Sequence, residues 1–331
     1  MKRRLPGATC LTGAALLALL AAGCTNASGL APPSGLEKTN LTVGAVPVAD
    51  EVGLYIAKDE HLFQDVGLNV TIDSIISSAD ATTGQNNGTY DITAGNSVSY
   101  IQDQVSHQSN LEIVAEGSLM EPDNQALYAL PGSRIATLAN IRGARIGVNA
   151  LNNIGTLLIS SVLQGNGIPP SEVHFVVIKA GFPGMAQALE QHAIDVAWLP
   201  EPFGSADSLK YGLQEIADLD QGATTSFPVG WYVVTKTWAR KYPHTLTAFL
   251  SALQQGQEIA DTDRAAVERA MQELPEPYRV PASITAIMTL ESYPLNIAPN
   301  IDASRVQRVA DAMFQAKMLP APFQVSSMLQ P

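Results

Sequence analysis

The chain alternates short apolar strands with helices, and this order constrains its fold more than any other feature. The expected strands are residues 41–46, 68–76, 90–94, 111–115, 125–130, 145–148, 173–178, 194–199 and 230–234. The helices expected between them are residues 52–63, 97–108, 156–165 and 183–191. Such alternation is typical of an α/β fold with mainly parallel sheets.

The strand and helix units fall into two groups, followed by a mostly helical region that begins near Lys241. We expect lobe 1 to comprise residues 41–128 and 230–331, and lobe 2 to comprise residues 129–229. A folded part of about 300 residues exceeds what one compact core usually holds, which also favours two lobes. A ligand would lie in a cleft between the lobes, where strands end and helices begin.

Residues 1–23 have the features of a secretory signal. Three basic residues precede an apolar run at residues 10–22, which is shorter than the roughly 20 residues needed to span a bilayer. The run ends in small residues followed by Cys24, which resembles a bacterial lipobox whose cysteine is acylated. The match is incomplete, since Leu20 stands four positions before the cysteine. An ordinary signal peptide cut near Ala22 is the alternative.

Residues 24–40 are expected to form a lipidated cysteine and a flexible tether, because Ser, Gly and Pro dominate the segment. The only other cysteine, Cys10, leaves with the signal. The mature chain then has no free thiol, which excludes disulfides, thiolate metal sites and cysteine nucleophiles. These features predict an extracytoplasmic protein that is lipid-anchored to the cell membrane.

The composition excludes several classes of protein. The chain has 31 acidic and 19 basic residues and a net charge of −12. Phosphate contacts need clustered Lys and Arg, so we expect no nucleic-acid partner. The five histidines are scattered, and no phosphate-binding loop, nucleophile elbow or dinucleotide fingerprint is present. We therefore expect no catalytic residue, no metal ion and no cofactor.

Several segments together resemble one family. They are residues 43–47 (Val-Gly-Ala-Val-Pro), 63–70 (Phe-Gln-Asp-Val-Gly-Leu-Asn-Val), 90–92, 138–148 and 198–202. Their order and spacing over residues 41–320 resemble the substrate-binding proteins of ABC importers. The most similar group binds nitrate, taurine, aliphatic sulfonates and thiamine pyrimidine precursors.

The resemblance implies a two-lobe periplasmic-binding-protein fold (type II) that closes on a small polar organic solute, sulfonate/taurine or aminopyrimidine-like, and delivers it to a permease. Its implied partners are a small-molecule solute, the membrane subunits of an ABC permease, and the membrane through the anchor at Cys24. We expect a monomer. A biosynthetic enzyme on the same fold, in a pyrimidine or menaquinone pathway, is the alternative. Such relatives act in the cytoplasm, so the signal segment argues against it.

Polar side chains after an expected strand or at expected helix starts are candidate ligand contacts. They are Ser78, Asn96, Ser97, Asn153 and Thr156. Free backbone N–H groups and small polar side chains at such positions can hold an anion or a carbonyl. In the resembling family the loop that contains Asn153 often faces the ligand. Ordinary N-capping explains the same residues, so both interpretations stay open.

Two acidic and two aromatic residues complete the candidate set: Asp50, Glu201, Trp198 and Trp231. Glu201 stands between two prolines, which would fix its carboxylate, and in the resembling family this turn commonly reaches the cleft. The alternatives are a helix-start acid for Asp50, an exposed acid for Glu201, and core aromatic residues. No Arg or Lys falls in these loops. The pocket should therefore favour an amine-bearing or aminopyrimidine solute, although taurine remains compatible.

Overall fold

The structure is a computed structural model and describes residues 35–106 and 108–330. The predicted signal segment, Cys24 and most of the predicted tether lie outside the described residues. None of the helices in the described ranges combines the length and the apolar character that a membrane span requires.

The first sheet has five strands in the order β2-β1-β3-β10-β4. They are β1 (Asn40–Ala45), β2 (Asn69–Ser74), β3 (Ile92–Asn96), β4 (Leu111–Leu119) and β10 (Pro228–Thr235). Strand β1 pairs in parallel with β2 and β3, whereas β10 is antiparallel to both of its neighbours. A strand from late in the chain is therefore inserted between two early ones.

The second sheet repeats this pattern in the order β7-β6-β8-β5-β9. Its strands are β5 (Gln125–Ala129), β6 (Arg145–Val148), β7 (His174–Val177), β8 (Val196–Pro200) and β9 (Gln214–Asp218). Strand β6 is parallel to β7 and β8, and β5 is antiparallel to β8 and β9. The predicted α/β class is confirmed, with mixed rather than purely parallel sheets.

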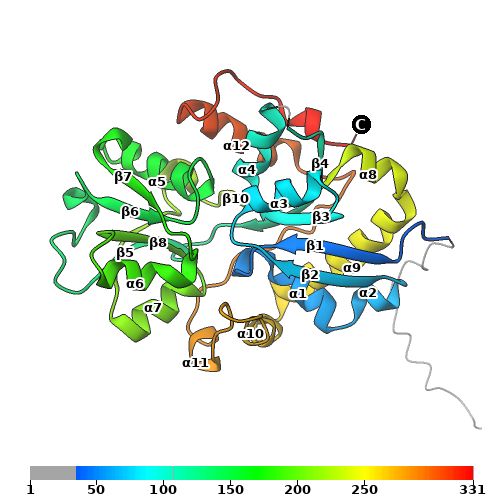
Figure 1. Ribbon diagram of the computed structural model, residues 1–331, viewed down its shortest axis with the longest axis horizontal. Helices are drawn as coiled ribbons and strands as arrows, with labels where there is room; N and C mark the ends of the chain where they lie inside the picture. Colours follow the sequence, from blue (N-terminus) through cyan, green and yellow to red (C-terminus); the bar gives the residue numbers. More distant parts are fainter. Residues whose placement is uncertain (1–34, 107, 331) are drawn as a thin grey trace, which may run out of the picture. The chain divides into compact units, whose positions relative to one another are not determined.

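Helices cover the sheets (Figure 1). They are α1 (Val52–Asp59), α2 (Leu62–Asp65), α3 (Ser78–Asn86), α4 (Ser97–Val105), α5 (Ile154–Gly165), α6 (Met185–Glu190), α7 (Phe203–Tyr211), α8 (Lys236–Lys241), α9 (Pro243–Thr262), α10 (Arg264–Gln272), α11 (Ala282–Thr285) and α12 (Ala303–Gln315). Figure 1 shows α5, α6 and α7 beside the strands of the second sheet. Helix α1 lies against α9, and a side chain on Gly256 would collide with the carbonyl oxygen of Gly53.

In the second sheet, the burial of a strand follows from its position, whereas the edge strand β4 of the first sheet is also buried. The central strand β8 is buried along its whole length, and β4 is buried except at its last residue. In the edge strands β7 and β9, most residues are exposed or half-buried. Strands covered by helices on both faces are expected to be continuous apolar runs, which is how β8 reads in the sequence. Strand β4 is buried although it contains Glu112 and Glu116.

The expected boundary at residue 128 is wrong by one strand. Strand β5 pairs with β8 and β9, so the chain passes between the sheets before Gln125 and returns after β9. A buried apolar strand carries no local mark of the sheet that it joins, because pairing is a tertiary property. The tether also ends earlier than expected, since the backbone N–H of Thr245 in α9 donates to Glu37 Oε2 at 3.0 Å.

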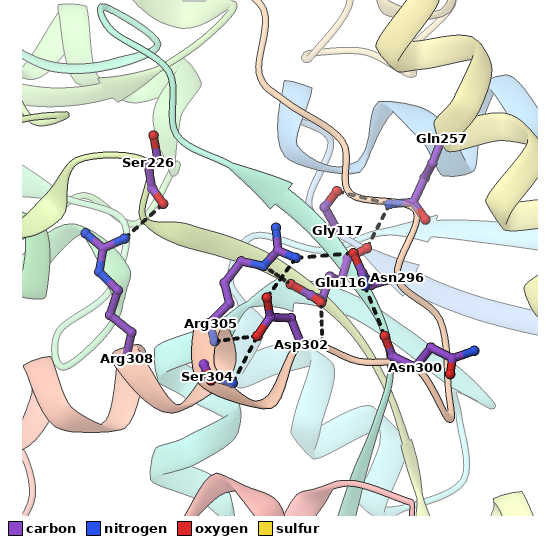
Figure 2. Close-up of polar contacts among 10 residues, drawn as sticks. All are labelled: Glu116, Gly117, Ser226, Gln257, Asn296, Asn300, Asp302, Ser304, Arg305 and Arg308. Atoms are coloured by element: carbon purple, nitrogen blue, oxygen red, sulfur yellow. Dashed lines mark hydrogen bonds and ion pairs between the residues drawn. The ribbon is translucent and has the colours of Figure 1, made fainter.

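A polar cluster around the buried Glu116 holds the C-terminal segment against β4, and Figure 2 shows it in close-up. We call Glu116, Gln257, Asp302 and Arg305 the Glu116 cluster. Arg305 Nε lies 2.7 Å from Glu116 Oε2, and the backbone N–H of Asp302 donates to Glu116 Oε1 at 2.9 Å. Gln257 Nε2 donates to the carbonyl oxygen of Glu116 at 2.8 Å. This cluster joins β4, α9 and the start of α12.

Candidate ligand-binding site

A small cavity of about 30 Å³ is lined by residues from both sheets. This volume holds about one water molecule, so the surrounding side chains nearly fill the space. The polar residues that line it are Asp50, Glu51, Ser78, Asn96, Gln125, Asn149 and Asn153. The apolar lining includes Phe182, Trp198 and Ile154. Strand ends and helix starts supply most of these residues, as expected for a ligand site in an α/β fold.

A larger hollow of about 930 Å³ lies elsewhere, beside α3, α4 and α8. Its charged and aromatic side chains already bind one another. Asp91 Oδ1 lies 2.5 Å from Lys38 Nζ and accepts a hydrogen bond from Trp238 Nε1 at 2.9 Å. None of the predicted site residues lines this hollow. The small cavity is therefore the better candidate, because buried polar groups converge there from both sheets.

Two adjacent carboxylates lie beside the cavity in a short 3-10 helix, Ala49–Glu51, that follows β1. Asp50 is 6% exposed and Glu51 is 3% exposed. Burial raises the pKa of Asp50 to about 6. Burial, together with the neighbouring Asp50, raises the pKa of Glu51 well above its usual range. Both groups therefore favour the protonated form more than an ordinary carboxyl does.

Asp50 has several partners. Its Oδ1 accepts hydrogen bonds from Ser118 Oγ at 3.2 Å and from Gln125 Nε2 at 3.3 Å. A third buried acid, Glu291, interacts with Asp50, and burial and the negative charge of Asp50 raise its pKa well above the usual range. Asn124 Nδ2 donates to Glu291 Oε1 at 2.7 Å. The acidic side of the cavity is thus backed by a network of neutral donors.

The first-sheet side of the cavity includes Ser78 and Asn96. Ser78 Oγ accepts hydrogen bonds from the backbone N–H and from Nδ2 of Asn96, both at 2.8 Å. Asn96 also caps α4, because its Oδ1 accepts from the backbone N–H of Ser99 at 2.9 Å. Ser97 is fully buried and lies outside the lining, since its hydroxyl donates to the carbonyl oxygen of Pro228 at 3.0 Å.

The second-sheet side is formed by the asparagine loop before α5. Asn153 and Thr156 form a reciprocal capping box. Thr156 lies outside the lining because its hydroxyl donates to the Asn153 carbonyl oxygen at 2.8 Å. Asn153 Nδ2 donates to Asn149 Oδ1 at 2.7 Å, and Asn149 Nδ2 donates to the carbonyl oxygen of Ile76 at 3.3 Å. Asn149 thus connects this loop to the end of β2.

Trp198 lines the cavity, but Glu201 and Trp231 do not. Glu201 is buried, and its carboxylate accepts hydrogen bonds from the Ser205 backbone N–H at 3.2 Å and hydroxyl at 2.7 Å. This local pairing keeps the carboxylate at the start of α7. Trp231 is buried in β10, where it belongs to the apolar core. The expectation that these two side chains face the ligand is therefore not met in this cavity.

The lining also contains residues that the sequence analysis did not single out, among them Glu51, Gln125 and Phe182. Glu51 has a visible signal, because it follows Asp50 in a segment whose next residues are apolar. Gln125 is the first residue of β5, and nothing in the sequence shows that it reaches Asp50. Phe182 lies after Gly181, before α6, and its ring contacts Trp198 edge to face, with centroids 5.2 Å apart.

Three polar atoms on the lining side chains are buried without a hydrogen-bond partner among the described residues. They are Glu51 Oε2, Gln125 Oε1 and Trp198 Nε1. Buried polar groups are normally satisfied, so these three atoms are candidate ligand contacts. Buried atoms without a hydrogen-bond partner in the described part of the chain also occur away from the cavity, as on Glu116, Gln257 and Arg305. No Lys, Arg or His belongs to the described lining. Across residues 35–106 and 108–330, no cluster of His, Cys, Asp and Glu is arranged to hold a metal ion.

The strand order of the two sheets and the solved structures below define the chain as a protein of the periplasmic-binding-protein fold, as predicted. Over residues 49–264 its sequence matches the family described as NMT1/THI5 like, and the chain belongs to that family. None of the curated protein sequences compared with it matches significantly.

Solved structures similar to this chain include three binding proteins. The ligand-binding component of an ABC-type import system from Staphylococcus aureus, with zinc bound, is 16% identical with a TM-score of 0.75, covering 89% of this chain and 97% of that one. The alkanesulfonate-binding protein from Xanthomonas axonopodis pv. citri, bound to MOPS, is 17% identical with a TM-score of 0.73, covering 89% and 99%. The periplasmic nitrate-binding protein from Synechocystis PCC 6803 is 14% identical with a TM-score of 0.72, covering 88% and 85%.

Proposed function

We propose that this protein is a lipid-anchored solute-binding receptor of an ABC importer. It captures a small polar organic solute, amine-bearing or aminopyrimidine-like, and delivers it to the permease. The observation that carries the proposal is the cavity lined from both sheets, with buried amides and carboxylates but no basic side chain among its described residues. Such a site can desolvate a small solute and satisfy its polar atoms.

Contacts between the two sides of the site support a mechanism of closure. The Ala49 backbone N–H donates to the carbonyl oxygen of Glu201 at 3.3 Å, and Asn149 Nδ2 donates to that of Ile76 at 3.3 Å. Gln125 Nε2, which donates to Asp50 Oδ1 at 3.3 Å, adds a third bond between the two sides. A solute that contacts both sides would favour the closed arrangement by its differential affinity for it. The crossings at residues 120–124 and 219–227 would act as the hinges of two lobes.

The membrane location is part of the proposal. Cys24 would carry the lipid, and the following segment up to the start of the fold would serve as the tether. The protein would then act as an extracytoplasmic monomer beside its permease. Replacing Cys24→Ser should move the protein from the membrane fraction to the soluble fraction. Mass spectrometry of the N-terminal peptide should find a diacylglyceryl group on Cys24; an unmodified, uncleaved N-terminus would contradict the anchor.

The receptor function is tested with the full-length chain extracted in mild detergent. Thermal unfolding is followed in a library with equal numbers of anionic, neutral and cationic solutes, including taurine, alkanesulfonates, nitrate and 4-amino-5-hydroxymethyl-2-methylpyrimidine. One solute should raise the unfolding temperature saturably and change the fluorescence of Trp198, with Trp198→Phe abolishing the fluorescence change. Absence of any saturable binder would refute the receptor function. Conversion of a bound pyrimidine into a new product would favour the biosynthetic alternative.

A further inference from the structure

We infer that the cavity is built for a protonated amine or amidine, and that Glu51 supplies the counter-charge for it. The inference rests on the proposed function, because it names the class of solute taken by the same site. It also assigns the ionic contact to a residue that sequence patterns pass over, in place of Glu201, whose carboxylate is bound by Ser205.

The charged groups around Glu51 are acidic. The ionisable group that acts most strongly on it is another acid, Asp50, and Glu51 in turn acts on Glu291. The described lining provides two carboxylates and no base to balance them. A buried carboxylate is costly unless it is paired, so the solute that this site favours most brings a positive charge. An anionic solute would add a third negative group to the cavity.

The unsatisfied atoms further restrict the class of solute that the cavity can bind. When Glu51 is ionised, Glu51 Oε2 and Gln125 Oε1 are both hydrogen-bond acceptors, and both lack a donor among the described residues. A protonated amine or amidine carries two or more N–H donors next to its charge, and can serve both acceptors at once. A quaternary ammonium ion has the charge but no N–H group. The site should therefore discriminate between these two kinds of cation.

Asp50 and Glu51 have different tasks in this arrangement. Asp50 Oδ1 is occupied by Ser118 and by Nε2 of Gln125. The second of these bonds fixes which way the Gln125 amide is turned and leaves its Oε1 without a partner. Asp50 is thus a positioning residue for Gln125, whereas Glu51 has a free oxygen for the solute.

The remaining walls suit the rest of such a solute. Phe182 stacks on Phe203, with centroids 5.6 Å apart, and meets Trp198 edge to face. Aromatic rings tolerate a neighbouring cation and exclude water from it. Trp198 Nε1 is a donor without a described partner, so the solute should also carry one neutral acceptor, such as a hydroxyl, a carbonyl or a ring nitrogen.

The test uses the full-length chain and the same charge-balanced library, followed by calorimetric titration of the strongest binder. Three planar isosteres, benzamidine, benzamide and benzoate, serve as matched probes of positive, neutral and negative charge. Glu51→Gln keeps the shape and removes the charge. Glu112→Gln is the matched control, because Glu112 is also a buried acid with a raised pKa but lies on β4 outside the cavity.

We expect the strongest binder to be a cation with N–H donors, and benzamidine to bind more tightly than benzamide and benzoate. Glu51→Gln should weaken the binding of the cation by about 30-fold or more, because it removes one member of a buried charge pair. Glu112→Gln should leave the affinity within about twofold. Should Glu51→Gln fail to fold, titration of the unmodified protein in buffers of different ionisation enthalpy replaces it, and release of protons on cation binding is the expected result.

Two outcomes overturn the inference while leaving the receptor function intact. One is a strongest binder that is anionic, neutral or a quaternary ammonium ion. The other is a cationic binder whose affinity is unchanged in Glu51→Gln, or whose binding releases no protons. Absence of binding from every charge class is a different result, since it refutes the proposed function and the inference together.

Discussion

The protein has buried carboxylates in two regions, and their surroundings differ. One has a basic partner, and the other has none among the described residues. In the Glu116 cluster, Glu116 is 1% exposed, Arg305 lies 2.7 Å from it, and a backbone N–H from Asp302 binds its other oxygen. Beside the cavity, Glu51 is 3% exposed and has neither a base nor a donor for Oε2 among the described residues. The same kind of group at the same depth has a counter-charge in one region and none in the other, although neither Glu116 Oε2 nor Glu51 Oε2 accepts a hydrogen bond among the described residues.

The difference is visible in the ionisation of the two groups. Burial raises the pKa of Glu116, but the Asp302 N–H and the Arg305 charge oppose the shift. Burial raises the pKa of Glu51 further, and the adjacent Asp50 adds to the shift. A paired buried acid fixes the position of a chain segment, whereas an unpaired one holds free energy that a ligand can release. Figure 2 shows the paired case, in which β4 and α12 are joined.

Among the tests of the difference between Glu116 and Glu51, the removal of Arg305 should have the largest effect. Arg305→Ala leaves Glu116 buried without its counter-charge, so we expect the free energy of unfolding to fall by about 3–5 kcal/mol. Urea denaturation measures the loss. Adding Glu116→Gln to Arg305→Ala should restore part of it, because the uncompensated charge is gone. A loss below about 1 kcal/mol would mean that the ion pair is as unimportant as an exposed one.

The pH dependence of stability should come from the unpaired region. The folded pKa of Asp50 is about 6 and its unfolded value is 3.8, so the folded state binds more protons between these values. Stability should therefore fall as pH rises from about 4 to above 6, by an amount on the order of 2–3 kcal/mol. Denaturation across this range, compared with Asp50→Asn, measures the effect. A rise in stability over the same interval would contradict the assignment.

The ionisable groups around Asp50 and Glu51 either also lower the stability as pH rises from about 4 to above 6, or do not titrate in that range. Glu291 is an acid whose pKa is raised by burial, so it adds to the fall. The tyrosines that surround the two acids have pKa values raised by burial and stay neutral; they are Tyr55, Tyr100, Tyr232 and Tyr293. In Asp50→Asn the slope should therefore be reduced but not abolished.

A smaller effect of opposite sign is expected for Glu51. Glu51→Gln removes an acid that the fold disfavours in its charged form, so stability at pH 7 should stay the same or rise by about 1–2 kcal/mol while solute binding is lost. Thermal unfolding without solute measures this change. The result would separate Glu51 sharply from Glu116, for which Glu116→Gln should be destabilising because Arg305 then loses its partner.

The smallest effect is expected for the exposed member of the Glu116 cluster. Asp302 Oδ1 caps α12 by accepting from the backbone N–H groups of Ser304 at 3.0 Å and Arg305 at 3.1 Å. Asp302→Ala should cost about 1 kcal/mol through the lost cap, and Asp302→Asn much less, because an asparagine oxygen also caps. Equal losses in the two variants would indicate that the charge of Asp302, rather than its cap, is what matters.

The sequence predicted those features that depend on local pattern. Strand β6 has the expected bounds at residues 145–148, and α5 follows the asparagine loop as expected. Helix α3 was missed because its residues lack an apolar stripe, although Ser77 and Asp80 form a capping box that the sequence displays. The sheet membership of β5 could not be predicted, since either sheet would bury it equally well.

The candidate site shows the same division. Asp50, Ser78, Asn96 and Asn153 were predicted from their places at strand ends and helix starts, and Trp198 as an aromatic candidate; all five line the cavity. Glu201 was expected beside them because nothing in the sequence reveals that Ser205 binds its carboxylate. Gln125 was missed because its role depends on Asp50, which lies far away along the chain. Side-chain pairing across the fold is the part that a single sequence does not display.

The insertion of β10 between β3 and β4 has a consequence for how the protein reaches its folded state. The second sheet draws all its strands from residues 125–218, whereas the first sheet is incomplete until the chain extends through Thr235. Strands that are this far apart in the sequence pair slowly, because the entropy cost of closing a long loop comes before any stabilising contact forms. The second sheet can therefore assemble first and serve as an early folding unit. Until β10 is in place, β3 and β4 each have an unpaired edge. At this stage of folding the chain is most prone to aggregate.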